Sequence, residues 1–205
     1  MAYYVGDIPV EDLVIEPAQN GEPLDLTPFN LVTAVLRDPE RQPVPEEFFA
    51  AIDGEEIVVE WPDSTPFAAD GLYELELTLE HSTLPQRLRL APVRIVAQGD
   101  NGWHTVDSAR DGWDDAPDAD ADLYELLELA KEAVIEYAPV LAEGEYPPLR
   151  YRKGQRMHAE NIWNACRVNP ASGGDGDGTF VLRPFPLDWQ VKQMLRPKRA
   201  VPVIG

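Results

Sequence analysis

Residues Leu72–Leu79 read LYELELTL, and apolar and polar side chains alternate strictly along this stretch. The odd-numbered positions from Tyr73 to Leu79 are all apolar, whereas Glu, Glu and Thr stand between them. Since successive side chains of a strand point to opposite faces of a sheet, this period of two predicts a half-buried antiparallel strand.

Similar stretches surround this one within the first hundred residues. They are NLVTAVLR (Asn30–Arg37), EIVVEW (Glu56–Trp61), RLRL (Arg87–Leu90), VRIVA (Val93–Ala97) and, more weakly, VEDLVIE (Val10–Glu16). Turn pairs such as Asp53-Gly54 separate them, and Pro92 indicates an edge position or a bulge. PEEFFAAI (Pro45–Ile52) fits either a helical turn or an irregular edge. Short strands at this spacing predict an antiparallel β-sandwich of immunoglobulin-like proportions over residues 1–98.

After Gly99 the apolar residues recur at three- and four-residue intervals, which is typical of helices. The spacing predicts a long helix over Asp122–Pro139, a second over Gly154–Val168 and a short one within His104–Asp115, anchored by Trp103 and Trp113. A last short helix, Trp189–Leu195, would be capped by Asp188. The expected fold class is therefore α+β with two domains: the sandwich, a small all-α module over 99–195, and an extended tail over 196–205.

The charge of the chain is large and uneven. Its 205 residues carry a formal net charge of −20, yet the segment from Tyr146 to Gly205 holds ten bases and four acids. The acidic surface disfavours free binding to nucleic acid or to an anionic membrane. The N-terminus lacks the basic and apolar regions of a signal peptide, and no run of about 18 apolar residues is present. We therefore expect a cytoplasmic product without a membrane helix.

No motif predicts a catalytic, metal or cofactor site. The acidic run Asp114–Asp122 fits a metal cage or a carboxylate pair, or more simply a solvated helix start. The glycine-rich segment Ser172–Thr179 has neither the calcium-loop residues nor the lysine of a phosphate loop. Cys166 and the scattered histidines lack zinc-site spacing. We expect a protein that is not an enzyme and has no cofactor.

The basic C-terminal segment has the composition of a docking strap. Trp189 precedes Lys192, Arg196, Lys198 and Arg199, and tryptophan and arginine dominate binding hot spots. AVPVIG (Ala200–Gly205) is rich in β-branched residues and suits strand addition to the sheet edge of a partner. The alternative interpretation is a frayed terminus.

The second half of the chain resembles the head-to-tail adaptor (head-completion) proteins of tailed bacteriophages, especially those of actinobacterial hosts. The resemblance rests on GWHTVDSARDGWDDAPDADADLYELLELAKEAVIEYAP, then QRMHAENIWNACRV, then PFPLDWQVKQMLRPKRAVPVIG, in this order. More loosely, LDLT (Leu24–Thr27) and ADGLYELELTL resemble the immunoglobulin-like domain that precedes this module in some phages.

This resemblance implies a structural protein located in the neck of the virion. During assembly the protein would be in the host cytoplasm. It would form a ring, usually of twelve subunits, between the portal protein and downstream connector or stopper proteins. DNA would pass through the channel of the ring without sequence-specific binding. No membrane partner is implied. The implied portal-binding residues are Trp189, Lys192, Leu195, Arg196, Lys198, Arg199, Val201, Val203 and Ile204. The candidate channel or interface acids are Asp114, Asp115, Asp118, Asp120 and Asp122.

Two other functions remain open at this point. A tail or baseplate binding module would use the sandwich to recognise a receptor or glycan, and it would need exposed aromatic side chains such as Trp61, Phe67 or Tyr73. A carboxylate-based hydrolase would need two acids held about 5–10 Å apart in a cleft, and no spacing in the sequence signals such a pair.

Overall fold

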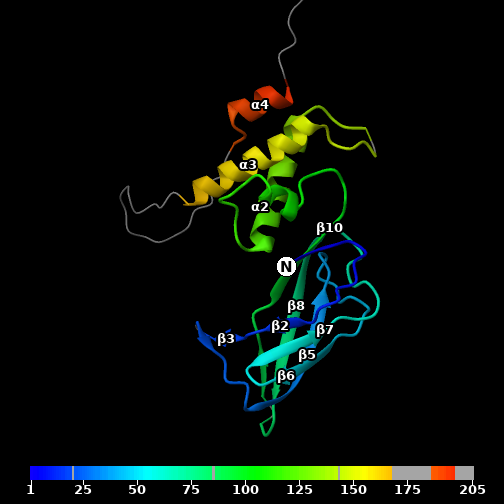
Figure 1. The fold of residues 1–205 in the computed structure, drawn as a ribbon, viewed down its shortest axis with the longest axis vertical. Helices are drawn as coiled ribbons and strands as arrows, with labels where there is room; N and C mark the ends of the chain where they lie inside the picture. Colours follow the sequence, from blue (N-terminus) through cyan, green and yellow to red (C-terminus); the bar gives the residue numbers. More distant parts are fainter. Residues whose placement is uncertain (20, 85, 143, 168–185, 197–205) are drawn as a thin grey trace, which may run out of the picture. The chain divides into compact units, whose positions relative to one another are not determined.

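The computed structural model describes residues 1–19, 21–84, 86–142, 144–167 and 186–196. The fold is mixed α+β, and the chain divides into two compact units, Met1–Gly99 and Asp100–Gly205. The first unit contains the strands and the second the helices (Figure 1). No helix in the described ranges combines the length and the apolar character needed to cross a membrane.

The first unit is built on two main sheets. The larger one has the order β1-β10-β8-β5, from Ala2–Tyr4, Val93–Gln98, Gly71–His81 and Phe29–Arg37, and β9 (Arg87–Arg89) also pairs with β8. The smaller one has the order β2-β7-β6, from Leu13–Ile15, Glu56–Glu60 and Phe49–Asp53. A two-stranded sheet joins β3 (Ala18–Gln19) to β4 (Glu22–Pro23). Among the described strands, every pair is antiparallel except β1 with β10.

Both main sheets contribute to one hydrophobic core. The alternation in Leu72–Leu79 is confirmed, because Tyr73, Leu75, Leu77 and Leu79 are at most 1% exposed. They share a cluster with Ile57 of the smaller sheet, so the two sheets cover each other's apolar faces. Burial of this continuous apolar surface is the main force that holds the unit together.

Pro92 interrupts the last strand of the first unit as its position predicts. On β8, Thr78 pairs with Arg89 and Leu75 pairs with Val93. Between these two pairs, the segment from Arg89 to Val93 contains one more residue than the facing segment of β8. An extra residue on one side of a strand pair is a β-bulge. PEEFFAAI, left open between a helical turn and an edge, supplies the edge strand β6.

Four helices form the described part of the second unit: α1 (Val106–Arg110), α2 (Asp120–Tyr137), α3 (Leu149–Arg167) and α4 (Trp189–Leu195). A capping box starts α1, because Thr105 and Ser108 each accept a hydrogen bond from the other's backbone N–H. Trp103 and Trp113 flank α1 and are at most 9% exposed, which confirms them as anchors. The cluster of Trp103, Val134, Tyr151, Val191 and Leu195 joins α2, α3 and α4.

The predicted start of the second long helix was wrong. The predicted helix starts at Gly154, whereas α3 begins at Leu149. Gly154 lies inside the helix, where an added Cβ would come within 3.3 Å of Leu195 Cδ2 and 3.5 Å of Val134 Cγ2. This glycine therefore allows neighbouring helices to approach closely and does not mark a helix end.

Candidate interaction surfaces

Helix α4 is packed firmly on its inner face. Asp188 caps it as predicted, and its Oδ1 accepts a hydrogen bond of 2.8 Å from the Gln190 N–H. Val191 and Leu195, one turn apart, are fully buried. Trp189 lies on the other side of the helix and is 62% exposed. The helix therefore presents one large aromatic side chain to solvent from a fixed backbone.

Two basic side chains of this segment lie over an aromatic ring of the same unit. The Lys192 Nζ is 5.8 Å and the Arg196 Cζ 5.0 Å from the centroid of the Tyr137 ring. Cation–π contacts at these distances attach α4 to the C-terminal end of α2. They also place positive charge where the dipole of α2 favours it.

These positions refine the predicted strap. Trp189 is accessible to a partner, and Arg196 is exposed. Leu195 is not a surface residue, because its side chain is 0% exposed within the core of the second unit; its assignment as a partner contact was wrong. The other predicted strap residues, Lys198, Arg199, Val201, Val203 and Ile204, lie outside the described residues.

The acidic run before and within α2 divides into two environments. Asp114, Asp115, Asp118 and Asp122 are exposed. Asp120 is partly buried and forms an ion pair with Arg110. In the described ranges, no group of three or more histidine, cysteine or acidic residues could hold a metal ion.

Arg110 fixes the connection between α1 and α2. Its Nη1 donates to Asp120, and its Nη2 donates to the carbonyl oxygens of Pro117 (2.9 Å) and Asp118 (2.8 Å). Burial raises the pKa of the Asp120 carboxyl, the hydrogen bond from Arg110 lowers it, and the net direction is downward. Ala119 occupies the N-cap of α2 without a side-chain hydrogen bond, so Asp118 does not cap this helix.

A buried polar network that sequence reasoning missed lies between α1, α2 and α3. Gln155 is 0% exposed; its Oε1 accepts from the His104 N–H at 2.9 Å, and its Nε2 donates to the Leu127 carbonyl at 3.1 Å. Burial and the positive charges of Arg152 and Arg156 lower the pKa of His104 to about 4. Burial also lowers the pKa of His158. The sequence does contain one indication of this network, because Gln155 is a polar residue on the inner face of α3.

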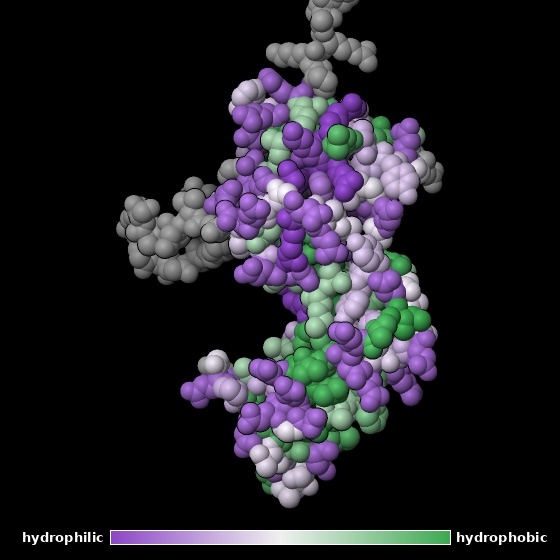
Figure 2. Space-filling view, in the orientation of Figure 1, coloured by the Kyte–Doolittle hydropathy of each residue, from purple (hydrophilic) through white to green (hydrophobic). Residues whose placement is uncertain are grey.

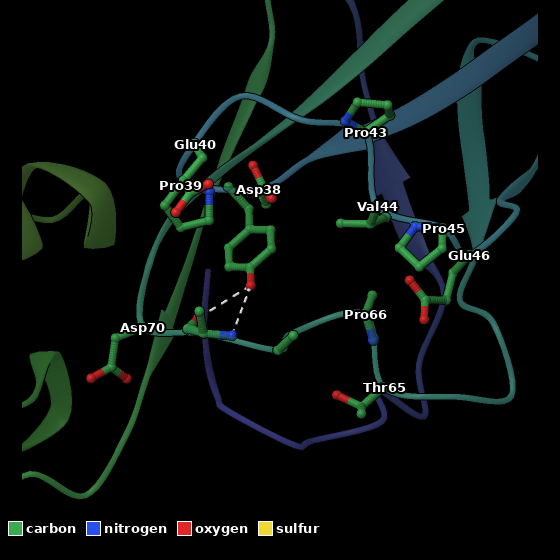
Figure 3. Close-up of a pocket in the computed structure, with 13 residues that line it drawn as sticks. Asp38, Pro39, Glu40, Pro43, Val44, Pro45, Glu46, Thr65, Pro66 and Asp70 are labelled. Atoms are coloured by element: carbon green, nitrogen blue, oxygen red, sulfur yellow. Dashed lines mark hydrogen bonds between the residues drawn. The ribbon is translucent and has the colours of Figure 1, made fainter.

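The first unit has a pocket of about 270 Å³ walled by Pro39, Pro43, Pro45 and Pro66 (Figure 3). Four acidic residues also line it: Asp38, Glu40, Glu46 and Asp70. Asp38 accepts a backbone hydrogen bond of 2.7 Å from Gln42, and Asp70 points away from the other labelled side chains (Figure 3).

The outward face of β8 is occupied by ion pairs. Arg37 Nε lies 2.8 Å from Glu76, and Arg87 Nη2 lies 2.8 Å from Glu80. The hydrogen bond from Arg37 is the main reason that the pKa of Glu76 lies below its ordinary value. The aromatic residues named for a glycan platform lie elsewhere, because Phe67 and Tyr73 are at most 1% exposed in the core. Trp61 packs edge-on against Tyr3 and Phe48.

Compared with protein-family models and with curated proteins, the chain matches neither a family model nor a curated protein.

Proposed function

We propose that the chain is a non-enzymatic head-to-tail adaptor of a tailed bacteriophage, located in the virion neck. In this proposal it forms a ring beneath the portal protein, binds downstream connector proteins, and surrounds the channel through which DNA passes. The observation that carries the proposal is the exposure of Trp189 on a helix whose opposite face is buried. The sequence resemblance in residues 102–205 supports the same function.

The proposed portal contact consists of Trp189, Arg196 and the basic segment that follows. A tryptophan that is 62% exposed on a fixed helix offers a large contact area at a small cost in conformational entropy. Lys192 and Arg196 add positive charge to the same helix and its C-terminal end, in contrast to the net charge of −20 of the whole chain. An acidic portal surface with an apolar recess would complement this surface.

We also propose that the first unit is an immunoglobulin-like β-sandwich. Its sheet orders β2-β7-β6 and β5-β8-β10 correspond to the B-E-D and C-F-G sheets of that architecture. Tyr73, near the start of β8, is hydrogen-bonded through its hydroxyl to the N–H and carbonyl of Ala69, each at 3.2 Å. This contact corresponds to the tyrosine corner near the start of strand F in such domains.

The acids proposed for the channel wall are now Asp114, Asp115, Asp118 and Asp122, which are exposed. Carboxylates on a channel wall repel duplex phosphates and let DNA slide. Asp120 is less suitable for this role because it is paired with Arg110.

The decisive experiment combines phage complementation with portal pull-down. Trp189→Ala and a deletion of residues 197–205 should each give folded protein that binds the portal at least about tenfold more weakly and fails to join filled heads to tails. Gln193→Ala is the matched control, because Gln193 is exposed on the same helix. Normal phage titres from both altered proteins would contradict the proposed contact.

The alternative, a receptor- or glycan-binding tail module, has weaker support because Phe67 and Tyr73 are buried. A glycan-array screen of residues 1–98 separates the two functions. Specific glycan binding there, together with no portal binding by the whole chain, would favour the alternative.

A further inference from the structure

Helix α2 carries an acidic face with exposed apolar side chains. Asp122, Glu125, Leu129, Glu132 and Glu136 recur at intervals of three and four residues, and all five are exposed. They lie opposite the buried stripe of the same helix. Leu129 and Ile135 are each 52% exposed, although both are large and apolar. We call Leu129, Glu132, Ile135 and Glu136 the α2 face.

The start of α3 carries the opposite charge, again next to exposed apolar side chains. Leu149 is 80% and Tyr146 66% exposed, and Arg150 and Lys153 are exposed beside them. We call Tyr146, Leu149, Arg150 and Lys153 the α3 face. The visible surface of the helical unit is mostly hydrophilic (Figure 2). Each face therefore combines charge of one sign with apolar area that a partner could cover.

The charges on both faces oppose the dipoles of their own helices. The last turn of α2 contains Glu136 and no basic residue, and the first turn of α3 contains Arg150 and no acidic residue. A negative charge at a helix C-terminus and a positive charge at an N-terminus both destabilise the helix. In the described part of the chain, neither Glu136 nor Lys153 forms an ion pair. Charged residues that destabilise their own helix without an ion pair in the fold indicate that these charges contact another molecule.

We propose that the α2 face of one copy of this chain binds the α3 face of a second copy. Opposite charges on the two faces attract, and Leu129 and Ile135 meet Tyr146 and Leu149 at the centre. The two faces are different, so the contact is head-to-tail and repeats until a ring closes or a filament grows. This inference names the subunit contact of the proposed adaptor ring, and only ring closure rests on the proposed function.

The test is sedimentation velocity of the full chain over a range of protein and salt concentrations. Wild-type protein should associate beyond a dimer at low salt and dissociate as salt screens the charges. Glu132→Lys with Glu136→Lys, and separately Arg150→Glu with Lys153→Glu, should each weaken association by more than about tenfold. Mixing the two double variants should restore it, because the reversed charges are again complementary.

Two controls test whether a change in net charge or a loss of helix, rather than the loss of the proposed contact, explains weaker association. Glu55→Lys with Asp63→Lys changes the net charge by the same amount as Glu132→Lys with Glu136→Lys, but at exposed sites of the first unit, and should leave association unchanged. Circular dichroism checks helix content, which Glu136→Lys and Arg150→Glu should not lower because both favour the helix dipoles.

Three outcomes would overturn the inference: wild-type protein that stays monomeric at every concentration, association that survives both reversals, or mixing that restores nothing. A largest species that is a dimer would exclude the head-to-tail contact as well. Portal binding through Trp189 is measured separately, so a failure here is distinguishable from a failure of the proposed function.

Discussion

At the scale of single residues, the buried polar groups of the second unit are the features that sequence patterns conceal. Gln155 is completely buried and connects the backbone at His104 to the backbone at Leu127. Its hydrogen bonds satisfy groups that would otherwise lose their contacts with water without compensation. The sequence shows only a glutamine within a helix, because its two partners are backbone atoms 51 and 28 residues away.

His104 should make the second unit sensitive to acid. Its pKa of about 4 in the folded chain is below the ordinary 6.5. Above pH 6.5 the ring is neutral in both states. Between pH 6.5 and 4 the unfolded chain binds a proton that the folded chain does not, so the free energy of unfolding decreases. Allowing for solvent screening, we expect a loss on the order of 1–2 kcal/mol by pH 4.5.

Urea unfolding at pH 7.5 and pH 4.5 measures this loss. His104→Gln cannot take up the proton, so its stability should fall less between the two pH values than that of the wild type. Equal losses in the two proteins would show that His104 does not contribute.

Several residue assignments could be made from the sequence, and others could not. Asp188 as a helix cap and Trp103 and Trp113 as anchors follow from local spacing, and all three are confirmed. The burial of Leu195 was missed because the basic residues around it suggested a surface, whereas its position one turn after Val191 places both on the inner side of α4.

At the scale of elements, the spacing of apolar residues predicts a helix better than the positions of glycine or proline do. The apolar stripe of α2 placed that helix within two residues at each end, from Asp120 to Tyr137. Gly154 suggested a start for α3 because glycine usually weakens helices, yet here it serves close packing. Strand β1 was not predicted, because its three residues are too few to show a period, and its pairing with β10 depends on residues 94 positions away.

Glu136→Lys should stabilise the helical unit while it weakens the proposed association. The substitution places a positive charge in the last turn of α2, which lacks a basic residue. We expect the free energy of unfolding to rise by about 0.3–1 kcal/mol, measured by urea unfolding of dilute protein at low salt. Glu132→Lys, one turn earlier, is the matched control and should change stability less. A decrease with Glu136→Lys would show that this carboxylate has a stabilising contact within the fold.

At the scale of the whole molecule, each unit has its own hydrophobic cluster. A unit of about a hundred residues can bury enough apolar surface to fold alone. We therefore expect a fragment of residues 1–99 to give a dispersed amide NMR spectrum and a cooperative unfolding transition. A fragment of residues 1–91 should be unfolded, because it lacks β10, which pairs with both β1 and β8. An unfolded 1–99 fragment would show that this unit depends on the rest of the chain.

The exposure of Trp189 also gives the molecule a natural optical reporter. All five tryptophans lie in the described ranges, and Trp189 alone is exposed. A soluble quencher such as iodide should therefore act mainly on the fluorescence of this one indole. Any protein that covers α4 should shift that emission to the blue and shield it from the quencher, so the arrival of a neighbour can be followed without a dye or a label.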